Sequence, residues 1–143
     1  MLIRNWESGD NYQIAELEKI CFSDAWTLQM VQKTQGESSF IGFVCEVQGE
    51  VVGYAGAICA YDLSDIALVA VKPEFRRKGI AQNLLKSLEQ ALFKNGVKKI
   101  YLEVRKSNEN AQNLYTKCGF YPIGIRKKYY ENTEDAIVME KVI

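Results

Sequence analysis

The chain has 143 residues, 48% of them apolar, which is enough for one domain with a substantial core, and we expect that domain to span residues 1–143. Its 18 basic and 18 acidic side chains balance, so no overall field favours nucleic acid or an anionic membrane as a partner. No stretch approaches the roughly 20 apolar residues that cross a bilayer, and we expect a cytoplasmic protein.

The first half of the chain is expected to form two helices followed by an antiparallel hairpin. Apolar residues at helical spacing predict a helix over 10–21, and Thr27 can cap a short second helix that ends before 36–39. Two β-rich runs, 40–47 and 51–60, then meet at a glycine-containing turn, which is typical of a hairpin.

The second half is expected to alternate strands and helices. In order, the pattern predicts a strand at 66–71, a helix that starts after Gly79 and stops at Asn95-Gly96, a strand at 100–104, a helix from Asn108 to Gly119, and strands at 123–130 and 135–141. A single helix between the first two of these strands makes a right-handed βαβ unit with parallel strands. The fold class that follows is mixed α/β.

The loop before the third helix is basic and contains a glycine: Arg76-Arg77-Lys78-Gly79-Ile80-Ala81. The first backbone N–H groups of a helix have no partner within the helix and lie at the positive end of its dipole, so they attract a phosphate. Gly79 allows a close approach of the backbone, and the three cations favour an anion. The sequence therefore predicts a binding site for a phosphorylated ligand.

Because the chain has no histidine, a general base or acid has to be Glu, Asp, Tyr, Cys or Lys. Glu103 interrupts an apolar strand, so it lies either on a solvated face or in a cleft. Tyr115 is on the apolar side of its helix, which by itself is typical of a core aromatic. The four cysteines are widely spaced and form no C-x-x-C motif, which predicts neither a metal site nor a disulfide framework.

The order of elements resembles the GCN5-related N-acetyltransferase (GNAT) superfamily over nearly the whole chain. Residues 76–81 fit its acyl-CoA loop pattern, Q/R-x-x-G-x-G/A. The chain resembles one branch of that superfamily more closely, the RimI-type ribosomal-protein-alanine N-acetyltransferases. The segments that carry this resemblance are 102–111, 114–120, 124–130 and 134–139. The segment 21–27 also fits, with Ala-Trp-Thr where that branch commonly has Pro-Trp-Ser.

The resemblance implies a central mixed sheet, flanked by helices and splayed between its two parallel strands, with acetyl-CoA as co-substrate and no metal. Backbone groups of the strand before the loop would hold the arm of acetyl-CoA, and the loop amides would hold its pyrophosphate. An N–H near Val69 or Ala70 is implied as the donor to the oxyanion. Asn108 is implied as a contact to the arm, although it also suits an N-cap. The implied cofactor-binding residues are Val69, Ala70, Val71, Arg76, Arg77, Lys78, Gly79, Ile80, Ala81, Asn108 and Tyr115.

The resemblance also implies roles for the two candidate catalytic side chains. Glu103 would take a proton from the acceptor ammonium through water, and Tyr115 would protonate the leaving thiolate. Asp65, at the start of the neighbouring strand, is the alternative base, although its short side chain suits a turn equally well. Cys118 is expected in the core, so we expect direct transfer rather than an acetyl-enzyme.

The implied acceptor is a protein partner, the N-terminal α-amine (alanine) of a small-subunit ribosomal protein. Trp26, Tyr130 and Glu134 are the implied substrate-binding residues. The basic, aromatic run at 126–130 is interpreted as a solvated strand face rather than a contact to nucleic acid. Two alternatives remain: a GNAT enzyme that acetylates a small-molecule amine, and a non-catalytic acyl-CoA-binding module.

Overall fold

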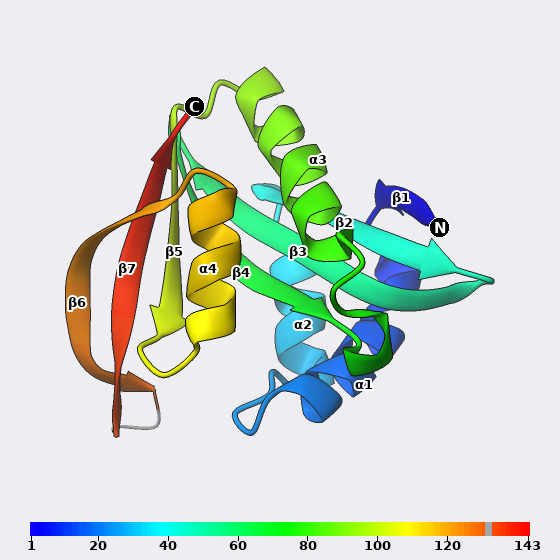
Figure 1. Ribbon diagram of the computed structural model, residues 1–143. Coiled ribbons are helices and arrows are strands. Elements are labelled where there is room, and N and C mark those ends of the chain that lie inside the picture. Colours follow the sequence, from blue (N-terminus) through cyan, green and yellow to red (C-terminus); the bar gives the residue numbers. More distant parts are fainter. Residues whose placement is uncertain (131–132) are drawn as a thin grey trace.

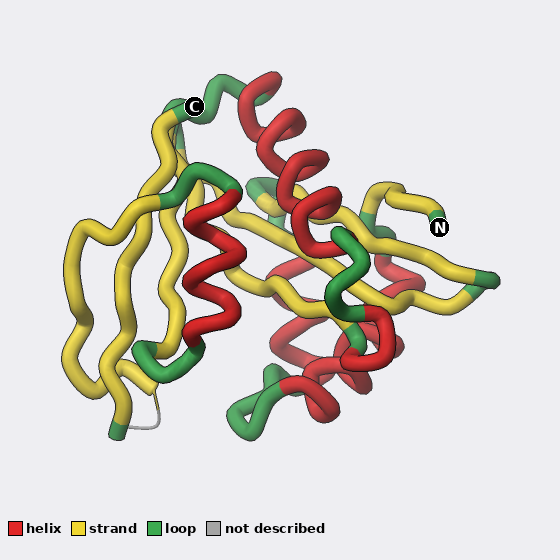
Figure 2. Tube along the Cα trace, viewed as in Figure 1, coloured by secondary structure: helices red, strands yellow, loops and turns green. Residues whose placement is uncertain are grey.

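A computed structural model describes residues 1–130 and 133–143 of the chain (Figures 1 and 2). Within these residues the elements, in order, are β1 (Leu2–Asn5), a 3₁₀ helix (Ser8–Asp10), α1 (Asn11–Cys21), α2 (Leu28–Gln35), β2 (Phe40–Val47), β3 (Glu50–Ala60), β4 (Leu63–Val71), a 3₁₀ helix (Pro73–Phe75), α3 (Ile80–Lys94), β5 (Lys99–Arg105), α4 (Glu109–Lys117), β6 (Tyr121–Tyr130) and β7 (Glu134–Val142). None of the helices in this part of the chain is long and apolar enough to cross a membrane.

The elements confirm most of the predicted boundaries to within two residues. The side chain of Thr27 accepts a hydrogen bond from Met30 N, as expected for the cap of α2. The strand predicted at 66–71 was too short, because β4 begins at Leu63. Strand β1 was not predicted at all, since four residues carry too little alternation to stand out and β1 is fixed by pairing with β2.

The described strands form one sheet of seven in the order β1-β2-β3-β4-β5-β7-β6. All neighbours are antiparallel except β4 and β5, which are parallel and joined through α3. That parallel pair is short: it runs from Leu63 opposite Lys99 to Asp65 opposite Tyr101, and beyond these residues the two strands are not paired. The expected splay between two parallel strands is therefore confirmed, and it opens the middle of the sheet.

Helices cover the two faces of the sheet differently: α3 and α4 lie in front of it in Figure 1, whereas α1 and α2 lie behind. On the α3 side, Ile80, Leu84, Leu88 and Leu92 form one buried stripe at helical spacing. On the other side α1 and α2 contribute Ile14, Leu17 and Val31 to a second buried cluster, which also contains Tyr54 of β3. Each such fully buried aliphatic side chain contributes about 1.5–3 kcal/mol, so both faces help to hold the sheet.

Alternation along β5 decides which of its side chains reach which face. Ile100, Leu102 and Val104 are buried in the cluster that contains α3. Successive strand residues point to opposite faces, so Glu103 and Arg105 project toward the face that carries α1 and α2.

Candidate active site

The opening between β4 and β5 exposes one backbone edge of β4. Lys72 N donates a 2.7 Å hydrogen bond to Val52 O of β3. Alternate strand residues direct their backbone groups to the same side, so those of Ala70 also face β3, where Ala70 lies opposite Tyr54. The backbone groups of Val69 and Val71 face the opening instead. Of the three predicted backbone contacts, Val69 and Val71 are therefore the two available to a ligand.

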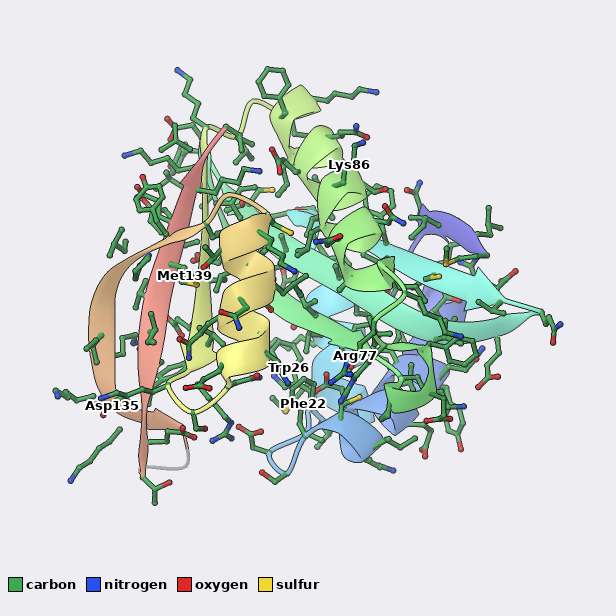
Figure 3. All side chains as sticks on the ribbon, viewed as in Figure 1. Phe22, Trp26, Arg77, Lys86, Asp135 and Met139 are labelled. Atoms are coloured by element: carbon green, nitrogen blue, oxygen red, sulfur yellow. The ribbon has the colours of Figure 1, made fainter. Side chains whose placement is uncertain are left out.

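The basic loop brings backbone amides, rather than all of its cations, to the start of α3. Arg76 folds back: its Nε donates to Val71 O at 2.9 Å, and its Nη2 lies 3.6 Å from Cys21 Sγ. Arg77 (labelled in Figure 3) and Gly79 both have left-handed backbones, with φ of 63° and 79°. Among the described side chains none caps the N-terminus of this 15-residue helix, which leaves its first amides for an anion. The loop fits a pyrophosphate.

Gly79→Val is expected to weaken acetyl-CoA binding by at least about 10-fold while the fold survives. A Cβ at Gly79 would meet nothing within 4 Å, so the new side chain would occupy the space over the loop amides, and its left-handed φ would be strained. Calorimetric titration with acetyl-CoA measures the change. Gly49→Val is the matched control, because Gly49 has a φ of 80° and equally open surroundings at the β2–β3 turn. Equal affinities of the two variants would show that the loop is not the phosphate site.

Glu103 lies two residues beyond Tyr101, the last residue of β5 that pairs with β4, at the rim of the opening. Its Oε1 accepts a 2.6 Å hydrogen bond from Nη1 of Arg126, whose guanidinium stacks on the ring of Tyr129 at 4.2 Å. Partial burial and the nearby charge of Glu103 raise the pKa of Asp65, so the two candidate bases are close enough to interact. The contact between Glu103 and Arg126 was not predicted. Arg126 is 54% exposed, which agrees with its predicted place on a solvated strand face, but nothing in the sequence indicates which carboxylate it pairs with.

Tyr115 lies on α4 and packs against the cluster on the α3 side of the sheet, opposite the face of Glu103, and Asn108 is the N-cap of α4. The ring of Tyr115 is half-buried and packs edge-to-face on Phe120, with centroids 6.0 Å apart. Asn108 caps the helix, since its Oδ1 accepts a 3.1 Å hydrogen bond from Ala111 N. A contact from Asn108 to a ligand would therefore use its Nδ2 as a donor. Cys118 is the C-cap of α4, and burial raises the pKa of its thiol.

The loop between α1 and α2 carries Trp26, and the buried carboxylate of Glu18 holds this loop in place. Glu18 is only 2% exposed; its Oε1 accepts from Trp26 N at 3.1 Å and its Oε2 from the Tyr54 hydroxyl at 2.5 Å. Burial raises the pKa of Glu18, and these two hydrogen bonds oppose that rise. The only signal for this role in the sequence is an acidic residue within an apolar helix pattern, and it does not name the partners.

Tyr54→Phe is expected to lower the free energy of unfolding by about 1–3 kcal/mol, because it removes a donor to a buried carboxylate. The loss should be greater at about pH 8 than at about pH 4. At the lower pH Glu18 is largely protonated in both states, whereas above its ordinary pKa of about 4.3 the unfolded chain ionises it freely and the fold has to accommodate it with one donor fewer. Urea unfolding at both pH values measures this, with exposed Tyr12→Phe as control. An equal loss at both would contradict it.

Glu134 lies at the first residue of β7, with both carboxylate oxygens engaged. Its Oε1 accepts from Arg105 Nη1 at 3.0 Å, and its Oε2 accepts from Ser107 N at 2.9 Å. Hydrogen bonds from Ser107, followed by that from Arg105, lower the pKa of Glu134. Tyr130 is the third residue predicted to bind the acceptor. Its backbone pairs with that of Glu134, and its side chain lies outside the described residues.

A separate cavity of about 160 Å³ lies between α3, the paired ends of β4 and β5, and the end of α4. Its lining includes Ile66, Leu85, Ile100, Phe120 and Lys141. None of the predicted site residues lines it. The chemistry is therefore expected at the splayed end of the two strands rather than in this cavity.

Comparisons with known proteins show the family of the chain. The model of the acetyltransferase (GNAT) family matches residues 11–120. A putative ribosomal protein bS18-alanine N-acetyltransferase of Bacillus subtilis is 34% identical over 139 residues, which are 96% of this chain and 92% of that protein. The ribosomal protein bS18-alanine N-acetyltransferase of Escherichia coli K12 is 32% identical over 140 residues, 96% of this chain and 94% of that protein.

The fold agrees equally well with a solved relative. The crystal structure of the ribosomal-protein-S18-alanine N-acetyltransferase from Escherichia coli superposes with a TM-score of 0.92 at 31% identity, over 99% of this chain and 93% of that one. The resemblance found in the sequence is confirmed at the level of fold and family. The chain belongs to the acetyltransferase (GNAT) family and is an acetyl-CoA-dependent N-acetyltransferase.

Proposed function

We propose that the chain transfers an acetyl group from acetyl-CoA directly to the N-terminal α-amine, an alanine, of a small-subunit ribosomal protein. Two relatives of 32% and 34% identity bear the name of a bS18-alanine N-acetyltransferase, and the similarity extends over 96% of this chain. Because a ribosomal protein is made and assembled in the cytoplasm, that is where the enzyme would act on it.

One geometric observation carries the chemical part of this proposal: the candidate base and the candidate acid lie on opposite faces of the sheet, next to one opening. Glu103 projects toward the α1–α2 face, whereas Tyr115 packs with the cluster on the α3–α4 face. An amine can then approach from one side and a thiolate leave on the other. This arrangement suits direct transfer, which needs proton removal and proton donation at two separate places.

The remaining roles follow from the groups around the opening. Acetyl-CoA supplies the activated acetyl group. The loop amides at 76–81 would hold its pyrophosphate, and the outward backbone groups of Val69 and Val71 would align its arm as an added strand does. The carbonyl oxygen of Val71 already accepts a hydrogen bond from Arg76, so the Val71 N–H is the group that remains to contact the arm. The Val69 N–H is the better-placed donor to the charge that develops on the acyl oxygen, since Ala70 faces β3.

Proton transfer is assigned to two side chains. Glu103 would accept the proton of the attacking amine through water, with Arg126 holding the carboxylate in place. Tyr115 would donate its phenolic proton to the leaving thiolate. Cys118 is poorly suited to form an acetyl-enzyme, because burial favours its neutral thiol over the reactive thiolate.

The test compares four acceptors at saturating acetyl-CoA, with thiol release and product mass as readouts. The acceptors are a peptide with the N-terminal sequence of the ribosomal protein, the same peptide with a blocked N-terminus, a shuffled peptide, and simple polyamines. The proposal expects one acetyl group on the free N-terminal peptide and none on the blocked one. Preferred acetylation of the polyamines would favour a small-molecule enzyme, and acetyl-CoA binding without thiol release for any acceptor would favour a non-catalytic module.

A further inference from the structure

Arg105, the last residue of β5, makes contacts to two chain segments that are far apart in the sequence. Its Nη2 forms a 3.0 Å ion pair with Asp24 of the α1–α2 loop, and its Nη1 donates a 3.0 Å hydrogen bond to Glu134 at the start of β7. The Arg105 side chain is 22% exposed, and the two carboxylates are 35% and 25% exposed. The contact with Glu134 is a charge-assisted hydrogen bond, whereas among the described residues the contact with Asp24 is an ion pair without hydrogen-bond geometry. Both are partly buried, so solvent screens them less than it screens a surface ion pair.

The segments joined in this way border the acceptor side of the opening. Asp24 is two residues from Trp26, whose backbone is in turn held by Glu18. In Figure 3 Trp26 lies on one side of the lower end of α4, and Asp135, the neighbour of Glu134, lies on the other. Arg105 itself follows Glu103 by two residues, on the same face of β5. The Arg105 guanidinium therefore links the α1–α2 loop to the start of β7, next to the candidate base Glu103. These two segments are the two walls of the proposed acceptor site.

Glu134 is one of the residues predicted to contact the acceptor directly. Both of its oxygens accept hydrogen bonds within the chain, from Arg105 and from Ser107 N, which gives Glu134 a structural use as well. It anchors the start of β7 to the end of β5, and it orients Arg105 toward Asp24. A planar guanidinium with several donors in a fixed fork can serve two carboxylates at once, which the single ammonium of a lysine does less well.

We propose that Arg105 is a positioning residue that clamps the α1–α2 loop to the start of β7 and thereby preforms the acceptor site for a peptide N-terminus. The inference rests on the proposed function, because it assigns these walls to a peptide acceptor. Without the clamp each wall keeps its own secondary structure, but their separation is no longer fixed. Binding of the acceptor then has to order the two segments, which weakens its affinity.

Arg105→Gln tests the clamp, with Arg4→Gln as the matched control. Arg4 likewise bridges two carboxylates, those of Asp10 at 2.8 Å and Glu46 at 3.1 Å, and is 26% exposed, but it lies on the edge strand β1, four strands away from β5. Arg105→Gln is expected to raise KM for the acceptor peptide at least about 10-fold, with kcat within about 3-fold and KM for acetyl-CoA within about 2-fold. Arg4→Gln should leave all three unchanged. Arg105→Lys should recover part of the lost affinity.

Hydrogen exchange gives a readout that does not depend on activity. Amides at 22–27 and at 133–136 should both exchange faster in Arg105→Gln than in the wild type, and neither should change in Arg4→Gln. If Arg105→Gln does not fold, Asp24→Asn and Glu134→Gln are measured instead, and each should loosen both segments and raise the peptide KM.

Unchanged exchange in either segment, an unchanged peptide KM in an active variant, or a rise confined to the KM for acetyl-CoA would each overturn the clamp. If the wild type acetylates no peptide, the proposed function fails, and the exchange measurement alone then decides whether Arg105 couples the two segments.

Discussion

Replacing Glu103 by glutamine is expected to lower kcat by about 10²–10⁴-fold, the usual contribution of a general base. Glutamine keeps the size of the side chain and can still accept a hydrogen bond from Arg126, but it cannot take a proton from the attacking amine. Binding of acetyl-CoA should be unaffected, because the loop at 76–81 and the open edge of β4 do not involve this carboxylate. Steady-state kinetics with the peptide acceptor, combined with calorimetric titration of acetyl-CoA, measure both quantities.

Asp65→Asn is the matched control for this experiment. Asp65 lies opposite Tyr101 at the last paired position of β4 and β5, and its pKa is raised by burial and, to a smaller extent, by the charge of Glu103. If Glu103 is the base, the control should lower kcat by no more than about 3-fold. Full activity of Glu103→Gln at every pH, together with a large loss in Asp65→Asn, would transfer the role to Asp65.

Local patterns in the sequence predict much of this fold for simple physical reasons. The leucines of α3 recur at helical spacing because one side of that helix is buried against the sheet. Thr27 and Asn108 cap their helices as expected, because a short side-chain oxygen can reach the first free amides. Gly79 adopts the left-handed backbone that the loop requires. These features depend on neighbours within a few residues, so the sequence carries them.

The features that could not be predicted depend on residues far apart in the chain. Glu18 and Tyr54 are 36 positions apart, and Arg126 and Glu103 are 23 apart, so nothing local identifies either pair. The same holds for the extent of the splay, since β4 continues as a regular strand to Val71 while its pairing with β5 stops at Asp65. Arg76 matched the loop pattern by its charge, yet its side chain turns back to Val71 O. Charge and periodicity indicate the kind of site, whereas tertiary contacts decide which side chains serve it.

Tyr115→Phe is expected to lower kcat by about 10²-fold or more, because the phenolic proton is the one assigned to the leaving thiolate. The fold should tolerate the change, since the phenylalanine ring can keep the edge-to-face contact with Phe120 and its packing against the α3-side cluster. Thermal unfolding checks the stability, and the steady-state rate with peptide and acetyl-CoA checks the chemistry. The affinity for acetyl-CoA should change by less than about 3-fold, since the substitution removes one hydroxyl from a site held mostly by backbone amides.

Tyr101→Phe is the matched control for Tyr115→Phe. Tyr101 loses the same hydroxyl, but it lies on β5 opposite Glu140 and on the other face of the sheet. Its effect on kcat should stay within about 3-fold. If both variants behave alike, the leaving thiolate takes its proton from water, and the role of Tyr115 is reduced to packing. A large loss of kcat in Tyr115→Phe alone, at unchanged stability, would instead show that the thiolate is protonated on the face of the sheet that carries α4. The amine would then lose its proton on the face that carries Glu103, as direct transfer across the opening requires.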